Sequence, residues 1–136
     1  MTQTATTNGK VILVADDDVD DQKLISDSFV DIHSGCVTEV VFNGQQAIER
    51  LANPDLPKPC LLILDLNMPV MGGMETLQHI RANRDLDSLP VVVLTTDNSK
   101  ESKKKTLTLG ANDYIVKPND YHTLTVVAEK MMQWCR

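Results

Sequence analysis

The chain has 136 residues and a formal net charge of -6 at pH 7. That length allows one hydrophobic core and is too short for a core plus a second folded module. The acidic balance repels the phosphate backbone, and the sequence has no sustained basic stripe with interleaved aromatic residues, so we expect no nucleic acid partner.

The start of the chain and its apolar runs exclude targeting and membrane segments. Residues 1–9 are rich in Thr and contain neither a basic residue nor an apolar run, which fits no secretory signal or transit peptide. We expect residues 1–9 to form a disordered lead and residues 10–136 to form one domain. The longest apolar runs, such as Leu61–Leu64, are far shorter than the roughly 20 residues of a membrane helix. We therefore expect a soluble cytoplasmic protein that does not contact a membrane.

Apolar segments rich in Val, Ile and Leu alternate five times with amphipathic stretches, which predicts repeated βαβ units and a parallel sheet. Several predicted strands are nearly all apolar, as strands covered on both faces should be. The predicted strands are Lys10–Ala15, Val37–Phe42, Cys60–Asp65, Pro90–Thr95 and Asn112–Val116. The predicted helices begin near Val19, Gly44, Gly72, Ser99 and Tyr121.

Capping residues and a proline-rich connector support the predicted helix boundaries. Asp18 can cap the first helix, Ser99 and Ser102 offer caps for the fourth, and Gly110 stands where a left-handed residue would end the fourth helix. Residues 53–59 contain three prolines and cannot pair in a sheet, so they separate the second helix from the third strand.

The cysteines and histidines give no pattern of a metal site or a disulfide framework. The cysteines are odd in number and form no Cys-x-x-Cys pair, which favours buried or idle thiols in a reducing compartment. They are Cys36, Cys60 and Cys135. The histidines lack the i, i+4 spacing of a helical metal site, and we expect ordinary surface positions. They are His33, His79 and His122.

Polar residues cluster where the predicted strands end. Asp16 and Asp17 follow the first strand, and Asp65 ends the third. Thr95 ends the fourth strand, and Lys117 follows the fifth. The carboxyl ends of parallel strands share one edge, where ligands bind at the point of strand-order reversal. We expect these five side chains to converge on one pocket.

Three carboxylates brought close together repel one another unless a proton or a cation relieves the repulsion. Carboxylate oxygens are hard ligands, so the sequence predicts a Mg²⁺ site, with Mn²⁺ as an alternative ion. Asp65 can then act as a carboxylate nucleophile in phosphoryl transfer, while Lys117 and Thr95 neutralise the phosphoryl oxygens. Pro118 follows the lysine, and an X-Pro bond can be cis, which would fix the direction of Lys117.

At this point the sequence resembles the receiver domain of two-component response regulators, and it is similar to single-domain members such as the chemotaxis response regulator. Four blocks carry the resemblance and cover nearly the whole chain after Gly9. They are Val11–Asp18, Leu62–Gly73, Pro90–Thr96 and Gly110–Pro118. The resemblance implies a doubly wound α/β fold with helices on both faces of a five-stranded parallel sheet in the flavodoxin-like order 2-1-3-4-5.

The resemblance also implies a phosphoacceptor switch in a phosphorelay. Asp65 would accept a phosphoryl group from a phosphohistidine of a sensor histidine kinase or phosphotransfer protein. Asp16, Asp17 and Asp65, with the backbone carbonyl of Asn67, would hold the metal. The domain would assist only its own phosphorylation and dephosphorylation, and would not be an enzyme acting on a separate substrate.

Further roles follow from the same resemblance. Thr95 and Lys117 would bind phosphoryl oxygens, and Tyr114 would change rotamer as the threonine moves. The residues themselves add a further expectation: Asn67 and Asp97 flank the acceptor and the threonine, and because neither is bulky or apolar, a water can approach there and hydrolysis should limit the phosphoryl lifetime. Because the chain ends with its last helix, we expect output through the surface of the fourth helix, fifth strand and last helix, toward a downstream protein or a second copy.

Several acidic and basic residues have ordinary explanations. Asp18, Asp20 and Asp21 stand in the first turn of a helix and are assigned to capping and solubility. Gly72 departs from the family, in which many members have Asp, and this alters a turn but no ligand. A basic patch on the fourth helix is a solvated face that can also steer an acidic partner. It consists of Lys100, Lys103, Lys104 and Lys105.

Two alternative functions remain open. An adaptor would keep the fold without phosphorylation, although every expected acceptor and ligand type is present. An aspartyl-phosphate phosphohydrolase would need a second acid two residues after the nucleophile. That position is Asn67, whose amide cannot donate and accept a proton in turn.

Overall fold

A computed structural model describes residues 9–135, so the predicted lead at residues 1–9 lies outside the described residues except for Gly9. Within these residues, five strands and five α-helices alternate. The strands are β1 Val11–Ala15, β2 Val37–Val41, β3 Leu61–Leu64, β4 Val91–Thr95 and β5 Asp113–Val116. The helices are α1 Val19–Asp31, α2 Gly44–Ala52, α3 Gly73–Ala82, α4 Lys100–Thr108 and α5 Tyr121–Met131. Two short 3₁₀ helices, which the sequence did not suggest, are η2 Arg84–Leu86 and η3 Met132–Trp134.

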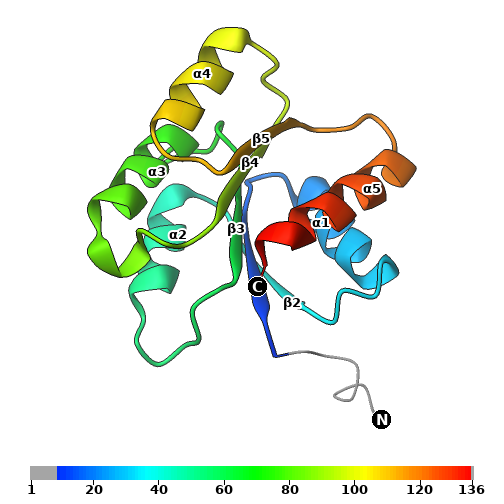
Figure 1. Ribbon diagram of the computed structural model, residues 1–136, viewed down its shortest axis with the longest axis horizontal. Coiled ribbons are helices and arrows are strands. Elements are labelled where there is room, and N and C mark those ends of the chain that lie inside the picture. The colour runs from blue at the N-terminus through cyan, green and yellow to red at the C-terminus, as the bar shows by residue number, and fades with distance from the viewer. Residues whose placement is uncertain (1–8, 136) are drawn as a thin grey trace.

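The strands form one parallel sheet in the order β2-β1-β3-β4-β5, which confirms the predicted fold class (Figure 1). The chain first winds from β1 to β2 on one side and then returns to place β3 on the other side of β1. Strand order therefore reverses between β1 and β3, where Ala15 is in register with Leu64. A ligand crevice is expected at the carboxyl ends of these two strands.

Alternation along the strands divides the core into two layers. In β1, Leu13 and Ala15 belong to the layer under α2 and α3, whereas Ile12 and Val14 belong to the layer under α1 and α5. Figure 1 shows α1 and α5 on one side of the sheet and the other three helices on the opposite side. Strands covered on both faces need apolar residues at every position, and β1, β3 and β4 are buried throughout.

The caps predicted at Asp18, Ser99 and Gly110 are confirmed, whereas Ser102 lies inside α4 and is not a cap. The Asp18 carboxylate accepts a hydrogen bond from the Asp21 backbone at 3.0 Å, and the Ser99 hydroxyl accepts one from the Ser102 backbone at 3.1 Å. Gly110 follows α4 with φ of 113°, a conformation that favours glycine. Each strand boundary lies within one residue of its prediction.

The prediction of three unbonded thiols is wrong. Cys60 and Cys135 form a disulfide with Cα atoms 4.8 Å apart, although 75 residues separate them in sequence. Their spacing along the chain gave no hint of this pairing, because the sheet and α5 bring together segments that are remote in sequence. The histidines are exposed surface residues, as expected.

The cis bond suggested before Pro118 is not present: every peptide bond in residues 9–135 is trans. The direction of Lys117 is fixed instead by hydrogen bonds at both of its ends. Its backbone N–H donates to the Thr95 carbonyl at 2.8 Å, and its ammonium is held by carboxylates described below. Within the described part of the chain, no helix has the length and apolar character needed to cross a membrane.

Gly73 lets α3 begin directly against the end of β3. A Cβ at Gly73 would overlap the carbonyl oxygen of Asp65, whereas a Cβ at Gly72 would stand 3.2 Å from the carbonyl oxygen of Leu66. We expect Gly73→Ala to lower the free energy of unfolding by about 1–3 kcal/mol, as overpacking does. Gly72, the N-cap of α3, is the neighbouring control, and Gly72→Ala should cost less than Gly73→Ala, about 0.5–1 kcal/mol, because alanine is a weaker N-cap than glycine. Urea unfolding of both variants measures this, and equal stabilities would contradict the close approach.

Candidate functional site

The predicted site residues converge at the carboxyl edge of the sheet. Asp16 directly follows β1 and Asp65 directly follows β3, at the point of strand-order reversal. Asp16 is 2% exposed and Asp65 is 7% exposed, so both carboxylates need partners. Asp17 is exposed at the rim.

Lys117 is the charged partner of both carboxylates. Its ammonium nitrogen Nζ lies 2.8 Å from Oδ2 of Asp16 and 2.9 Å from Oδ2 of Asp65. The lysine follows β5, so a residue from the far end of the chain reaches across the β4 end to the two central strands. The predicted meeting of Asp16, Asp65 and Lys117 is therefore observed in the geometry.

Asp21 is a member of this cluster that the sequence reading missed. Its Oδ2 lies 2.7 Å from Nζ of Lys117, although Asp21 was assigned to capping and solubility. Asp21 stands in the first turn of α1, and the tight connection after β1 turns that part of the helix toward the site. The sequence did contain a signal for this contact: Asp21 stands in the first turn of a helix that begins just after Asp16 and Asp17, so its side chain can reach the same site.

The charges in the cluster shift the pKa values of two groups. Burial alone would lower the pKa of Lys117, but hydrogen bonds to Asp16, Asp21 and Asp65 outweigh it and raise that pKa above its ordinary value. The ammonium therefore stays protonated at neutral pH. Burial raises the pKa of Asp16, against the opposing hydrogen bonds from Lys117 and from the Asp18 backbone. The buried carboxylate thus depends on nearby positive charge to remain ionised.

The donor set also fits a hard divalent cation. Carboxylate oxygens of Asp16, Asp17 and Asp65 lie within 4.8 Å of one another. One ammonium shared among Asp16, Asp21 and Asp65 leaves the cluster negative, and oxygen ligands of this kind suit Mg²⁺ or Mn²⁺. Asn67, the other expected metal ligand, stands two residues after Asp65, and its backbone N–H approaches Oδ1 of Asp65 at 3.4 Å.

Thr95 is the last residue of β4, beside this cluster, and Asp97 lies in the loop that leads from β4 to α4. Thr95 is fully buried, and its hydroxyl oxygen is 3.4 Å from the backbone nitrogen of Asp97. The carboxylate of Asp97 accepts hydrogen bonds from the Ser99 backbone at 2.9 Å and from the Ser102 hydroxyl at 2.6 Å. Asp97 therefore orders the start of α4 as well as flanking the threonine.

Tyr114 is buried next to the same connection. Its side chain is 6% exposed, and its hydroxyl donates to the backbone carbonyl of Asp97 at 2.7 Å. Burial, followed by the charges of Asp97 and Asp65, raises the pKa of Tyr114. The aromatic ring therefore links β5 to the loop that leads from Thr95 into α4.

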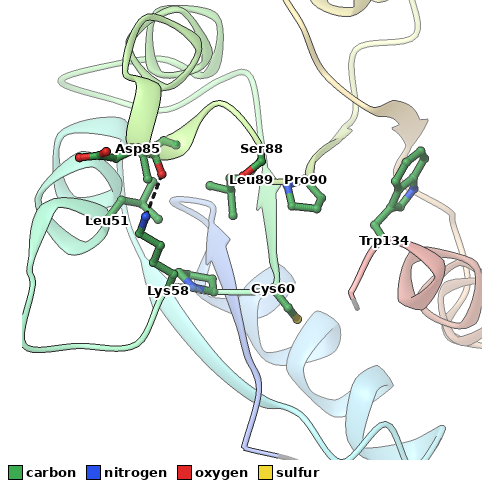
Figure 2. A pocket seen from close by; sticks show the side chains of 10 residues that line it. Leu51, Lys58, Cys60, Asp85, Ser88, Leu89, Pro90 and Trp134 are labelled. Atoms are coloured by element: carbon green, nitrogen blue, oxygen red, sulfur yellow. Dashed lines mark hydrogen bonds between the residues drawn. The ribbon is translucent and has the colours of Figure 1, made fainter.

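A separate cavity of about 390 Å³ lies at the opposite, amino end of the sheet (Figure 2). Lys58 spans one wall and donates a hydrogen bond to the Asp85 carbonyl at 2.8 Å, while Trp134 stands on the other side. None of the predicted site residues lines this cavity.

Comparison with known proteins decides the family. The sequence model of the family called response regulator receiver domain matches residues 12–129 of this chain. The chain belongs to the response regulator receiver domain family. As a receiver domain it is a phosphoacceptor-type signalling module of two-component systems, similar to the chemotaxis proteins of this fold.

Two relatives show the range of proteins that carry such a receiver domain. A chemotaxis protein CheY homolog of Campylobacter jejuni is 32% identical over 120 residues, which are 88% of this chain and 88% of that protein. A protein-glutamate methylesterase/protein-glutamine glutaminase of Desulfotalea psychrophila is 35% identical over 109 residues. The match spans 80% of this chain but only 29% of the methylesterase, so it concerns one part of that larger protein.

Solved receiver domains share the whole fold. The Mn²⁺-bound response regulator Rcp1 superposes with a TM-score of 0.83 at 29% identity, covering 93% of this chain and 95% of that one. The phosphorylated cyanobacterial phytochrome response regulator RcpA has a TM-score of 0.84 at 26% identity, covering 93% of each chain. Divalent metal binding and phosphorylation therefore occur in proteins of this architecture.

The buried acids of this receiver domain depend on Lys117 for neutralisation. Replacing Lys117 by Met keeps the apolar stem and removes the charge, leaving Asp16 and Asp65 without their cation. In EDTA we expect the free energy of unfolding to fall by about 3 kcal/mol, as when one partner of a buried ion pair is removed. The control is Lys23→Met, which breaks an exposed pair with Asp27 and should cost less than about 0.5 kcal/mol. If urea unfolding gave Lys117→Met the stability of the parent, the lysine would not be the counter-charge.

Proposed function

We propose that this receiver domain takes a phosphoryl group from a phosphohistidine onto Asp65 and signals through its own surface. The observation that carries the proposal is the contact of the Lys117 ammonium with Asp65 and Asp16 at the strand-order reversal. A buried carboxylate next to an ammonium and further acids is the arrangement that phosphoryl transfer to a carboxylate requires. The donor would be a sensor histidine kinase or a phosphotransfer protein in the cytoplasm.

In the proposed reaction, a carboxylate oxygen of Asp65 attacks the phosphorus atom. A P–O bond forms while the P–N bond to the donor imidazole breaks. Lys117, already hydrogen-bonded to Asp65, lies where it can neutralise one phosphoryl oxygen, and the Thr95 hydroxyl can donate to another. Mg²⁺ bound by Asp16, Asp17, Asp65 and the Asn67 carbonyl would neutralise the remaining charge.

The residues around the acceptor would set the lifetime of the phosphoryl group. Asn67 is exposed beside Asp65, and a small polar residue there leaves room for an approaching water. Asp97 also flanks the site, but its carboxylate is engaged with Ser99 and Ser102, so a substitution there would disturb α4 as well. Asn67 is therefore the cleaner position at which to alter the lifetime.

Output would pass through the surface of α4, β5 and α5. The four lysines of α4 are exposed and would favour binding of an acidic downstream protein. A second copy of the chain could also dock on this surface. Tyr114 connects this surface to the site through its hydrogen bond to Asp97. We infer that the buried position of Tyr114 is one of two arrangements, and that phosphorylation biases them through Thr95.

The acceptor assignment is tested by intact-mass spectrometry after incubation with acetyl phosphate and Mg²⁺. We expect the parent to gain one phosphoryl group and Asp65→Asn to gain none, because an amide cannot form the acyl phosphate. Asp20→Asn is the control, since Asp20 is exposed on the first turn of α1, and it should label like the parent. Labelling of Asp65→Asn at the parent rate would refute the assignment.

The switch is tested by amide exchange and Tyr114 side-chain signals, measured with and without beryllofluoride and Mg²⁺. We expect slowed exchange along α4, β5 and α5 and a changed environment of the Tyr114 ring. Thr95→Val keeps the shape of the side chain and removes the hydroxyl, so it should retain the changes around Asp65 and lose those at Tyr114. Changes confined to the loops around Asp65 in the parent would contradict the switch.

A further inference from the structure

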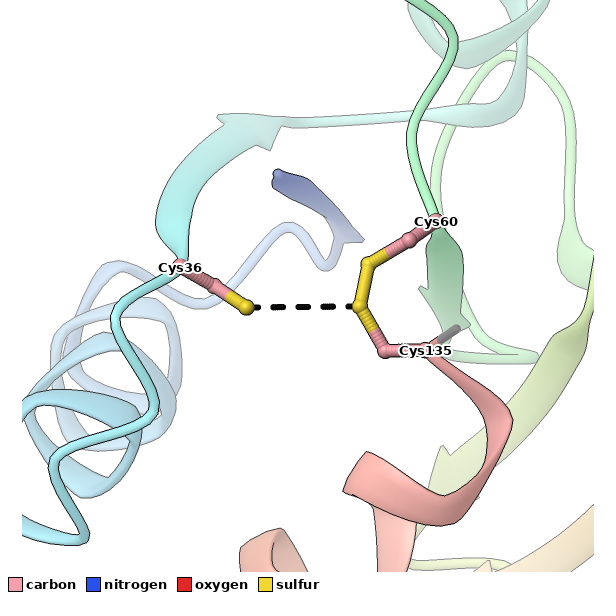
Figure 3. Close-up of side chains that lie close together, drawn as sticks. All are labelled: Cys36, Cys60 and Cys135. Atoms are coloured by element: carbon pink, nitrogen blue, oxygen red, sulfur yellow. Dashed lines mark hydrogen bonds between the residues drawn. A yellow bond between two sulfur atoms is a disulfide. The ribbon is translucent and has the colours of Figure 1, made fainter. Parts of the chain in front are cut away.

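Three sulfur atoms meet at the amino edge of the sheet, at the end opposite to Asp65 (Figure 3). Cys60 and Cys135 are joined by a disulfide, and Sγ of Cys36 lies 4.0 Å from Sγ of Cys135. All three sulfurs are within 4.8 Å of one another. These are all of the cysteines in the chain, so no other thiol competes for pairing.

The parallel sheet explains why the sulfurs meet. β2 and β3 lie on either side of β1, and each begins with a hydrogen bond to the start of β1: Val37 donates to Lys10 and Cys60 donates to Val11. Cys36 and Cys60 therefore flank the same end of β1. Cys135 follows η3, which continues α5. α5 packs on the sheet in the same core layer as Ile12 and Val14, and Cys135 is only 6% exposed there.

We propose that these cysteines form a thiol–disulfide centre, a reversible oxidation site in which Cys135 is the shared sulfur and Cys36 and Cys60 are its two partners. The oxidant class is a two-electron oxidant such as hydrogen peroxide, and the reductant class is a dithiol. The proposal is independent of the acceptor chemistry at Asp65.

Formation of the disulfide balances with one peroxide. The Cys60 thiolate, which is partly exposed, attacks one peroxide oxygen and becomes a sulfenic acid as hydroxide leaves, and this hydroxide takes up the proton that the Cys60 thiol has lost to give a first water. The Cys135 thiolate then attacks the Cys60 sulfur, forming the S–S bond and expelling hydroxide, which takes up a proton to give a second water. Two thiols thus lose two electrons, and the peroxide gains them.

The third sulfur permits exchange without a further oxidant. The Cys36 thiolate attacks Sγ of Cys135, so a Cys36–Cys135 bond forms while the Cys60–Cys135 bond breaks. Cys60 leaves as a thiolate and takes up the proton that Cys36 has lost. The 4.0 Å approach of Cys36 to Cys135 places the sulfurs near each other before the exchange.

The bond would fasten the last helix to the sheet. The two cysteines are 75 residues apart in sequence, and a cross-link that closes a long loop lowers the conformational entropy of the unfolded chain most. In a reducing compartment such a bond persists only while an oxidant is present, which is the behaviour of a redox-responsive site. Oxidation would therefore change the stability of α5 and η3 without touching the carboxylate cluster.

The experiment uses the full chain, oxidised with hydrogen peroxide or reduced with dithiothreitol, then alkylated with a maleimide and mapped by mass spectrometry without reduction. We expect a Cys60–Cys135 link with only Cys36 alkylated after oxidation, and three alkylated cysteines after reduction and unfolding. The reduced protein should melt about 10 °C or more below the oxidised protein.

Single substitutions separate the sulfurs. Cys36→Ser should retain the Cys60–Cys135 link, and Cys60→Ser should form a Cys36–Cys135 link instead. Cys135→Ser should form neither link, and its melting temperature should not respond to peroxide. Absence of the Cys36–Cys135 link in Cys60→Ser, with the parent link intact, would refute the exchange.

Two outcomes would overturn the proposal as a whole. One is a parent protein in which all three cysteines are alkylated when it is unfolded after peroxide treatment. The other is a reduced protein that binds one Zn²⁺, resists peroxide when loaded, and loses the metal in each of the three serine variants. That result would make the cluster a thiolate metal site, because three sulfurs this close also suit a soft cation.

Discussion

The structure depends on one ammonium group placed among buried acids. Lys117 lies within hydrogen-bonding distance of Asp16, Asp21 and Asp65, which come from the β1 end, α1 and the β3 end. Without that charge, two nearly buried carboxylates would face each other at the junction of the two central strands. The same contact links the end of β5 to the ends of β1 and β3, so it joins the site to the edge of the sheet that carries the proposed output surface.

β4 and β5 extend this coupling away from the acids. Thr95 ends β4 beside the cluster, and its carbonyl accepts the backbone hydrogen bond of Lys117. Tyr114, two positions from the end of β5, is hydrogen-bonded to the loop that begins at Thr95. A change in charge at Asp65 can thus reach α4 through a short series of direct contacts, so the proposed switch requires a rearrangement of Thr95 and Tyr114 and leaves the rest of the core in place.

β3 has a polar group at each end. Asp65 follows its last residue, and Cys60 precedes its first. Between them, Leu61–Leu64 are buried under helices on both faces, so the strand is a rigid spacer between the carboxylate cluster and the sulfur cluster. The two proposed reactions, phosphoryl transfer at one edge of the sheet and thiol oxidation at the other, would therefore disturb each other little.

The sequence by itself determined the strands, the α-helices and the caps of α1 and α4, because apolar runs, helical periodicity and capping residues are local properties of the chain. It also predicted that Asp16, Asp65, Thr95 and Lys117 would share one edge, since the ends of parallel strands must. Tertiary structure alone decided that Asp21 joins the lysine and that Cys60 bonds to Cys135. Those contacts depend on how a helix turn or a chain end packs against the sheet, and sequence spacing carries no record of distances between segments that only folding brings together.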